Sequence, residues 1–296
     1  MQEIDTLKKR KQELLSLINE AETEASVKKL TLNGSYGKFG SKYSKFYAPD
    51  LLIGTTLSGQ LYLLCLIEKL VGAGVDVLSA NTDGVTYAGT PEKCELGGKI
   101  IREYAEQTGF EFEFVEYKCL AQKDVNNYFA VKQDRSVKAK GIYAPVTLSK
   151  NPTAPICSTA VSKWLAFGTD FMDTIRSAEF HEFISVRSVN KEGGGIQGDA
   201  RLGRVVRWYY TTDKTLPPIN YVENGNKVAK SDGARACMVM KDKVTHPEDL
   251  DYMWYYLESL KIAKAVGCEE FLTDEQIRLI TPPPKVRKPR VKKGKI

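Results

Sequence analysis

The chain has 296 residues, 42% of them hydrophobic, with 43 basic and 37 acidic side chains and a formal net charge of +6. This composition is enough for one large or two modest hydrophobic cores and predicts a globular protein. The longest unbroken apolar run, Leu61 to Ile67, is far shorter than the roughly 20 residues that cross a bilayer, and the polar amino terminus does not resemble a secretory signal. We therefore expect no membrane anchor and a cytoplasmic location.

The six cysteines are widely spaced, no two of them form a C-x-x-C pair, and the chain has only two histidines. This spacing excludes the common structural zinc patterns and a disulfide framework.

The positive charge is concentrated at the carboxyl end. Removing the seven basic residues of segment 281–296 from a net charge of +6 leaves −1 for the rest of the chain. We expect this segment to be a flexible basic tail, which either adds salt-sensitive affinity for phosphates or is simply solvated. The seven residues are Lys285, Arg287, Lys288, Arg290, Lys292, Lys293 and Lys295.

The first predicted element is helical, from about Ile4 to Leu32, because apolar residues recur three, four and seven positions apart. The polar stretch 19–25 leaves two alternatives open, one long helix or two antiparallel helices. Asn33, Gly34 and Gly37 are expected to end the helix.

A second helix is predicted from about Thr55 to Val71. Two β-rich runs, 75–80 and 85–88, then flank the sequence Asn-Thr-Asp-Gly, which is typical of a hairpin with an Asp-Gly turn. Thr90 and Pro91 predict the start of a third helix, as a cap and a first-turn proline, and Gly109 predicts its end.

Alternation of phenylalanine and glutamate predicts a half-buried strand at 110–114. Two further strands are predicted at 128–132 and 137–143, and the three prolines of 145–155 indicate a linker. The remaining segments indicate helices at 158–167 and 247–266 and a strand at 204–210. The order of elements predicts an α+β fold.

Two short constellations carry candidate chemistry. Lys29, Asn33 and Tyr36 are four and three residues apart, so they share one helical face and offer a cation, a neutral donor and a flat aromatic surface. Asp83 at the hairpin tip offers a carboxylate of the kind that Mg²⁺ prefers. Taken singly, the first pattern is also typical of a solvated face and the second of a purely conformational turn.

Together, in this order and with a helix between them, the two segments resemble motifs of the family B DNA polymerases. Residues 29–37 resemble the K-x-x-x-N-S-x-Y-G motif, and 81–84 resemble the D-T-D-S metal motif. The resemblance implies that Lys29 and Asn33 bind the phosphates of an incoming dNTP, that Tyr36 lies near the nascent base pair, and that Asp83 is catalytic and binds Mg²⁺.

The metal motif departs from the family at two positions. Asn81 replaces the first aspartate and Gly84 replaces the serine. Asn81 is the second candidate metal ligand, but an amide supplies no negative charge, so the resemblance leaves activity undecided.

Weaker matches imply a grip on a DNA primer–template. Residues 125–141 resemble the family's K-x-Y region and lysine–glycine strand, with Asn126 in place of the first lysine, so Tyr128, Lys138 and Lys140 are the candidate DNA contacts. A surface strand rich in lysine is the structural alternative. Segments 202–210 and 249–256 resemble thumb segments of phage-type members, in which Arg204 and Arg207 would reach the duplex backbone.

The resemblance implies four parts. They are a fingers helix, or pair of helices, with the nucleotide-binding motif at 1–53; the second half of the palm, with antiparallel strands around a catalytic hairpin, at 54–144; a mostly helical thumb at 145–280; and the basic tail at 281–296.

One carboxylate cannot hold the two Mg²⁺ ions that polymerases use. The family's other aspartate precedes the nucleotide-binding helix in a D-x-x-S-L-Y-P-S motif, which residues 1–28 do not contain. We therefore expect a split polymerase subunit, located in the host cytoplasm if viral, that shares two Mg²⁺ ions with a second subunit carrying the exonuclease and the first palm aspartate.

Two alternatives remain at this point. The chain could be a non-catalytic DNA-binding or structural subunit derived from a polymerase, or an enzyme of another family that shares only the K-x-x-x-N helix.

Overall fold

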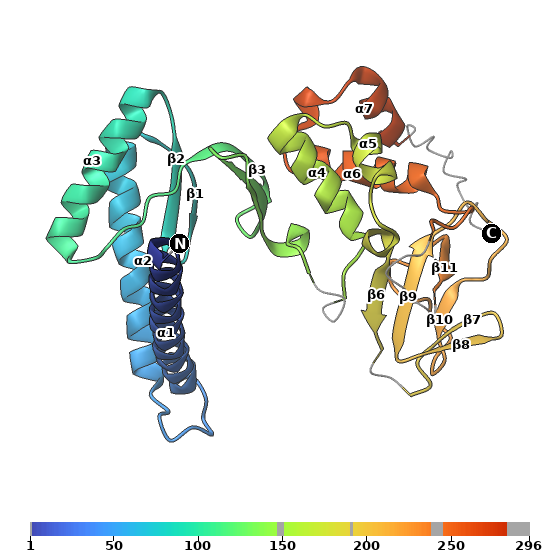
Figure 1. Ribbon diagram of the computed structural model, residues 1–296, viewed down its shortest axis with the longest axis horizontal. Coiled ribbons are helices and arrows are strands. Elements are labelled where there is room, and N and C mark those ends of the chain that lie inside the picture. The colour runs from blue at the N-terminus through green and yellow to red at the C-terminus, as the bar shows by residue number, and fades with distance from the viewer. Residues whose placement is uncertain (1, 147–150, 190–191, 238–244, 283–296) are drawn as a thin grey trace, which may run out of the picture. The chain divides into compact units, whose positions relative to one another are not determined.

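The computed structural model describes residues 2–146, 151–189, 192–237 and 245–282, and the backbone alone for residues 2–5. The chain divides into two compact units, Met1–Glu113 and Phe114–Ile296, each with its own hydrophobic core. The expected basic tail lies outside the described residues from 283 onwards. Figure 1 shows the elements of each unit.

The first unit begins with one continuous helix, α1 (Gln2–Phe39), so of the two alternatives the single long helix is the one observed. The predicted stop at residues 33–37 is wrong, because α1 continues through Gly34 and Gly37. A glycine inside a helix costs only about 1 kcal/mol, which the helix-forming residues around it offset. The chain turns after Phe39, where the Ala48 N–H donates to its carbonyl at 3.0 Å.

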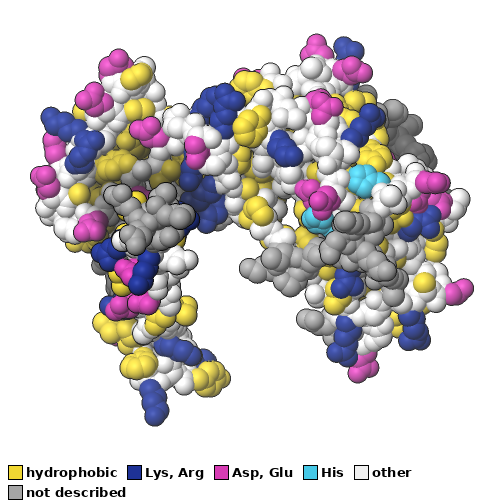
Figure 2. Space-filling view, viewed as in Figure 1, with side chains coloured by type: hydrophobic (Ala, Val, Ile, Leu, Met, Phe, Trp, Pro, Cys, Tyr) yellow, Lys and Arg dark blue, Asp and Glu magenta, His cyan; other side chains and the backbone are white. Residues whose placement is uncertain are grey.

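The second helix, α2 (Pro49–Gly72), starts six residues earlier than predicted, with Pro49 in its first turn. Leu66 and Leu70 are its buried side chains, and most of its other apolar residues are exposed. Figure 2 shows such hydrophobic side chains on the lower part of the α1–α2 pair.

By length and composition, α2 is the one helix in the described part of the chain that could cross a membrane. The sequence-based expectation counted only the unbroken run at 61–67, whereas the whole helix is apolar on average. Helices of soluble proteins meet the same criterion when other elements cover their apolar face. Within the first unit almost none of this face is covered.

The predicted hairpin is present as β1 (Asp76–Asn81) and β2 (Gly84–Ala88). The next helix, α3 (Pro91–Thr108), has the predicted ends: the Thr90 hydroxyl accepts from the Lys93 N–H, and Gly109 adopts a left-handed φ of 73°. The hairpin and α3 pack against α2 in a small core of Leu66, Leu70, Val75, Ile101 and Tyr104.

The strand predicted at 110–114 is absent, and this prediction was wrong. No neighbouring strand pairs with the segment. Its alternating side chains instead pack on the helices: the Phe110 ring meets Tyr62 at 5.1 Å, and the Phe112 ring meets Tyr104 at 6.4 Å.

The second unit begins with an antiparallel sheet of three strands. The predicted strands at 128–132 and 137–143 correspond to β4 (Asn127–Lys132) and β5 (Val137–Ala139), and the second ends early in a 3₁₀ turn at Gly141–Tyr143. The partner on the other side, β3 (Tyr117–Asp124), was not predicted.

The rest of the second unit combines helices with two small sheets, which hold more strands than the mostly helical thumb we expected. The helices are α4 (Pro155–Phe167), α5 (Phe171–Arg176), α6 (Tyr252–Ala265) and α7 (Asp274–Ile280). One sheet contains β6 (Ser185–Ser188), β9 (Val205–Tyr210) and β11 (Ala234–Ala236); the other contains β7 (Gly195–Gln197), β8 (Ala200–Gly203) and β10 (Ile219–Tyr221).

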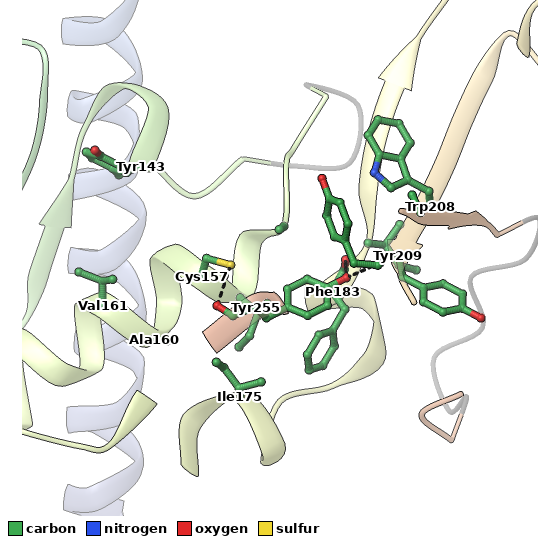
Figure 3. Close-up of a cluster of buried hydrophobic side chains, with 14 of the residues drawn as sticks. Tyr143, Cys157, Ala160, Val161, Ile175, Phe183, Trp208, Tyr209 and Tyr255 are labelled. Carbon is green, nitrogen blue, oxygen red and sulfur yellow. Dashed lines mark hydrogen bonds between the residues drawn. The ribbon is translucent and has the colours of Figure 1, made fainter. Parts of the chain in front are cut away.

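Tyr255 of α6 links these helices to the sheet that contains β9 (Figure 3). Its hydroxyl donates to the carbonyl of Phe183 and accepts from the N–H of Tyr210, both at 2.9 Å. The Cys157 thiol of α4 donates to the Tyr255 carbonyl at 3.6 Å. The mixture of helices and antiparallel sheets confirms the α+β class.

Candidate functional site

The candidate nucleotide-binding residues lie in the carboxyl-terminal third of α1. Because the helix is regular there, Lys29, Asn33 and Tyr36 occupy positions that share one face, as predicted. Lys29 and Asn33 are exposed and Tyr36 is half-exposed. The adjacent Lys28 is instead engaged with Glu24, at 2.6 Å. The face therefore presents an amine and an amide to solvent.

Tyr36 also joins the two long helices. Its hydroxyl shares a hydrogen bond with the hydroxyl of Thr56 in α2, and its ring meets the edge of Phe39 at 6.4 Å. The aromatic side chain is thus held at its tip, which fixes where the end of α1 lies on α2.

The second candidate, Asp83, lies at the hairpin tip. Asn81 pairs with Gly84, so the loop consists of Thr82 and Asp83, and neither has a left-handed φ. Gly84 belongs to β2 and also lacks a left-handed φ, so the predicted Asp-Gly turn is displaced by one residue. Asp83 is exposed beyond the ends of both strands.

Asn81 stabilises this tip. Its side-chain oxygen accepts from the N–H of Thr82 at 2.9 Å and from the Thr82 hydroxyl at 3.0 Å. The oxygen that was predicted to bind metal therefore already has two donors within the loop.

The elements that carry the two candidate groups both pack against α2, on adjacent sides of this helix. The contact with α1 uses Thr56, and the contact with the hairpin and α3 uses Leu66. Thr56 and Leu66 are ten residues apart. At 100° per residue, their side chains leave α2 in directions about 80° apart around its axis. Figure 1 shows α3 on one side of α2, with the hairpin and α1 on the other.

The described residues do not make a complete metal site. Within them, no group of three or more His, Cys, Asp and Glu side chains could hold an ion. Asp83 contributes one carboxylate, and Asn81 a neutral oxygen that is already hydrogen-bonded. This donor set does not fit a pair of Mg²⁺ ions.

The candidate DNA contacts of the second unit share one face of the first sheet. Lys138 pairs with Ala130, and the Lys140 N–H donates to Tyr128 at 2.9 Å, so Tyr128, Lys138 and Lys140 lie on the same side. The opposite face buries Phe129 and Val131 in the core. Both lysines are exposed, so the sheet presents two cations beside an aromatic ring.

A tight loop contact fixes this strand. The Asn127 amide donates to both oxygens of Asp124, at 2.8 and 2.9 Å, and its oxygen accepts from the Ile142 N–H at 2.8 Å. Gly141 adopts a left-handed φ of 63°, and a Cβ there would come within 2.1 Å of the Asn127 oxygen. Asn126, which stands in the first K-x-Y position, is part of this turn and donates its N–H to Asp124.

The two candidate arginines belong to a different sheet. Arg204 immediately precedes β9 and is exposed, and Arg207 lies in β9 and is half-buried. Between and beyond them Val206, Trp208 and Tyr210 are buried.

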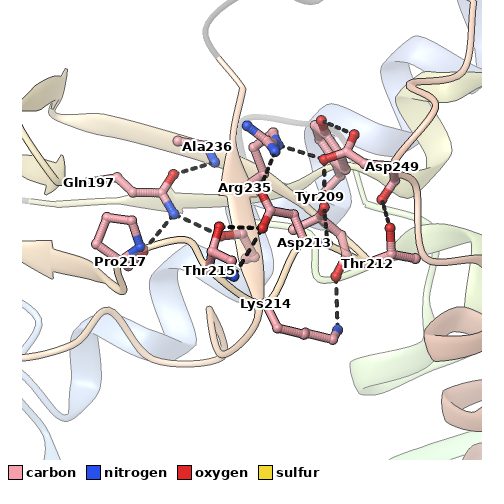
Figure 4. Close-up of polar contacts among 12 residues, drawn as sticks. Gln197, Tyr209, Thr212, Asp213, Lys214, Thr215, Pro217, Arg235, Ala236 and Asp249 are labelled. Atoms are coloured by element: carbon pink, nitrogen blue, oxygen red, sulfur yellow. Dashed lines mark hydrogen bonds and ion pairs between the residues drawn. The ribbon is translucent and has the colours of Figure 1, made fainter.

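A polar network that sequence reasoning missed includes Tyr209 of the same strand and residues from other segments (Figure 4). Asp249 accepts from Tyr209 at 3.0 Å, Thr211 at 2.6 Å and Arg235 at 2.7 Å, and Arg235 also contacts Asp213 at 2.9 Å. Partial burial raises the pKa of Asp249, but the hydrogen bonds from Thr211, Arg235 and Tyr209 outweigh it and hold the pKa below its ordinary value. Burial, followed by the hydrogen bond to Asp249, raises the pKa of Tyr209. The residues of this network are up to 40 positions apart in the sequence, so no local sequence pattern indicates it.

No family model matches the sequence. Two curated relatives match parts of it. The chain is 30% identical over 116 residues to DNA polymerase 1 of Saccharolobus solfataricus and 29% identical over 85 residues to DNA polymerase 2 of Aeropyrum pernix. The matches cover 38% and 29% of this chain, but only 13% and 10% of those proteins. They confirm, for part of the chain, the predicted relationship to DNA polymerases.

Proposed function

We propose that this chain is a subunit of a template-directed DNA polymerase of the phage type. It contributes the nucleotide-binding helix, one Mg²⁺-binding aspartate and a grip on the primer–template, and it adds dNTPs to a primer 3′ end only with a partner chain. The observation that carries this proposal is that α1, with Lys29, is bonded to α2 through Tyr36 and Thr56, and that the hairpin, with Asp83 at its tip, packs against the same helix.

The roles of the α1 residues follow from their chemistry. The exposed Lys29 amine pairs with the triphosphate as a point charge, and Asn33 donates a neutral hydrogen bond one turn further on. Tyr36, held by Thr56, offers the face of its ring to the base or sugar. These residues bind and orient the nucleotide.

Magnesium requires the partner. Two Mg²⁺ ions, when bound, activate the primer hydroxyl and neutralise the leaving pyrophosphate. The donors described above do not hold that pair, so we assign the second aspartate, and with it the completed site, to the partner subunit. In this proposal the partner also carries the first palm aspartate and the exonuclease.

Tyr128, Lys138 and Lys140 form the proposed primer–template grip, with Arg204 and Arg207 as further phosphate contacts. Contacts of lysine and arginine with phosphates position a duplex without reading its sequence. We therefore expect DNA binding that is independent of sequence and weakens steeply with salt.

One observation favours a second function, a non-catalytic DNA-binding subunit derived from a polymerase. Asn81 lacks charge, and its oxygen is committed to Thr82 in the loop. A tip that is stabilised in this way keeps the hairpin shape without serving a metal ion.

A reconstitution separates the two functions. Primer extension is measured with this chain alone, with a polypeptide that carries a D-x-x-S-L-Y-P-S segment, and with both together. Synthesis that appears only in the combined sample supports the polymerase subunit. Formation of the complex on DNA without synthesis supports the non-catalytic subunit.

A further inference from the structure

The first two thirds of α1 expose an apolar stripe. Leu7 is 66% exposed, Leu14 45%, Leu17 57% and Ile18 52%. The hydrogen bond that fixes α1 on α2 lies far along the helix, at Tyr36. A helix that exposes so many leucines over several turns is typical of one that pairs with another helix.

The stripe has the spacing of a coiled coil. Leu7, Lys11, Leu14, Ile18, Ala21 and Ala25 are separated by four, three, four, three and four residues. This is the alternation of core positions in heptad repeats, in which one side of the helix continuously faces a partner helix.

When a second copy of the helix runs antiparallel to the first, each of these six core positions lies opposite another core position. Leu7 then faces Ala25, Lys11 faces Ala21 and Leu14 faces Ile18, so the numbers of each facing pair add up to 32. Two identical surfaces related in this way form an isologous twofold interface. We propose that this surface of α1, residues 7–25, binds α1 of a second copy of the chain in an antiparallel helix pair centred near Ser16.

The charges that flank the stripe are complementary in this arrangement. Lys8 and Arg10 lie beside the core positions at one end, and Glu22 and Glu24 lie beside them at the other. Antiparallel pairing brings Lys8 beside Glu22 of the second copy and Arg10 beside its Glu24. The antiparallel pair therefore has opposite charges beside the core positions at both ends, as charge complementarity between partner helices requires.

The residues at the centre of the helix pair, and the one polar residue among the core positions, also fit the antiparallel arrangement. Leu15 and Leu17 flank the core at the twofold axis, where each meets its own counterpart. Lys11 faces Ala21, whose small side chain leaves room for the aliphatic stem of the lysine to lie across the interface while its amine reaches water.

The salt bridges within the single helix do not oppose this pairing. Arg10 contacts Glu13 at 3.2 Å, and Glu24 contacts Lys28 at 2.6 Å, in both cases between highly exposed side chains. Such pairs contribute little and exchange readily. The proposed contact between core positions spans residues 7–25, and it does not depend on the proposed function.

Charge reversal tests the proposal. The mass of the purified full chain is measured by sedimentation equilibrium across a concentration series. We expect a reversible dimer for the unaltered chain. Lys8→Glu with Arg10→Glu, or Glu22→Lys with Glu24→Lys, places like charges opposite each other and should give monomers. An equimolar mixture of the two variants should restore the dimer, and so should one chain that carries all four changes.

Glu13→Lys with Glu20→Lys is the matched control for Glu22→Lys with Glu24→Lys, because it makes the same charge change on the outer face of α1. This control should remain a dimer, and circular dichroism should show unchanged helix content in every variant. The proposal is overturned if the unaltered chain is monomeric at all concentrations, as it would be if a different polypeptide occupies the stripe. It is also overturned if the unaltered chain and both charge-reversal variants form the dimer equally well, since another surface then holds the dimer together.

Discussion

The hydroxyl of Tyr36 is hydrogen-bonded to the hydroxyl of Thr56, and this bond ties the carboxyl-terminal turn of α1 to α2. Lys29 and Asn33 lie on the same face as Tyr36, so the bond also fixes the direction in which the candidate nucleotide-binding residues point. The hairpin with Asp83 packs on the adjacent side of α2. The candidate site thus depends on one helix that serves as the common support of both its halves.

Replacement of Lys29 by alanine should weaken dNTP binding. The exposed amine is the triphosphate contact in our account, and a charged hydrogen bond of this kind contributes about 1.5 to 3 kcal/mol, so we expect the KM for dNTP to rise about 10- to 100-fold in the reconstituted enzyme. Lys28→Ala is the matched control, because Lys28 is adjacent but is engaged with Glu24. Equal KM values for the two variants would remove Lys29 from the site.

Replacement of both Lys138 and Lys140 by alanine should weaken duplex binding at low salt. Two fewer phosphate contacts should reduce the slope of log K against log salt by about 2, whatever the DNA sequence. Lys261→Ala with Lys264→Ala serves as the control, because these lysines of α6 pair with Glu258 and Glu269. Fluorescence anisotropy with a labelled hairpin duplex measures both slopes, and an unchanged slope in the first variant would contradict the proposed grip.

Gly141→Ala should destabilise the second unit. The left-handed φ strains any other residue, and the added Cβ would lie 2.1 Å from the Asn127 oxygen and 2.3 Å from the Asn126 carbonyl, so we expect a loss of about 3 kcal/mol. Gly168→Ala, also in the second unit, has a similar φ of 71° but open space around the new Cβ, and should cost about 1 kcal/mol. Urea unfolding of both variants measures the difference, and equal losses would show that the contact with Asn127 is not restrictive.

Asp249 should make the stability of the second unit depend on pH in the acidic range. Its pKa is lowered in the folded protein, so its ionised form contributes stability at neutral pH, and this contribution is lost as the pH falls through the folded-state pKa. Asp249→Asn should therefore cost about 1 to 2 kcal/mol at neutral pH and progressively less in acid. Unfolding measured across this pH range, with the exposed Asp199→Asn as control, tests the sign. The prediction would be contradicted if the difference in unfolding free energy between Asp249→Asn and the unaltered chain increased as the pH falls.

The sequence predicted those elements whose ends are encoded locally. The third helix is one case, because Thr90 and Gly109 provide a cap and a left-handed stop within a few residues of the helix. The hairpin is another, since its two β-rich runs are neighbours. The triplet of α1 also appears on one face, because helical spacing alone determines that result.

Features decided by distant neighbours were not predicted. The strand β3 lacks regular alternation and forms because β4 lies beside it, whereas residues 110–114 alternate well but find no partner strand. The network of Asp249 and Arg235 joins residues from separate segments. α1 continues past Gly34 because the helix propensities of the surrounding residues outweigh the small cost of the glycine. The presence of a glycine alone does not show which of the two is larger.

The central claim is that Asp83 takes part in DNA synthesis, and it is tested most directly by primer extension with the reconstituted complex. Asp83→Ala is compared with Asp76→Ala, a change at the far end of the same hairpin, where the carboxylate contacts Lys93 at 3.0 Å. We predict that synthesis is lost with Asp83→Ala and kept with Asp76→Ala, while both complexes still bind DNA. Undiminished synthesis by the Asp83→Ala complex would contradict the account.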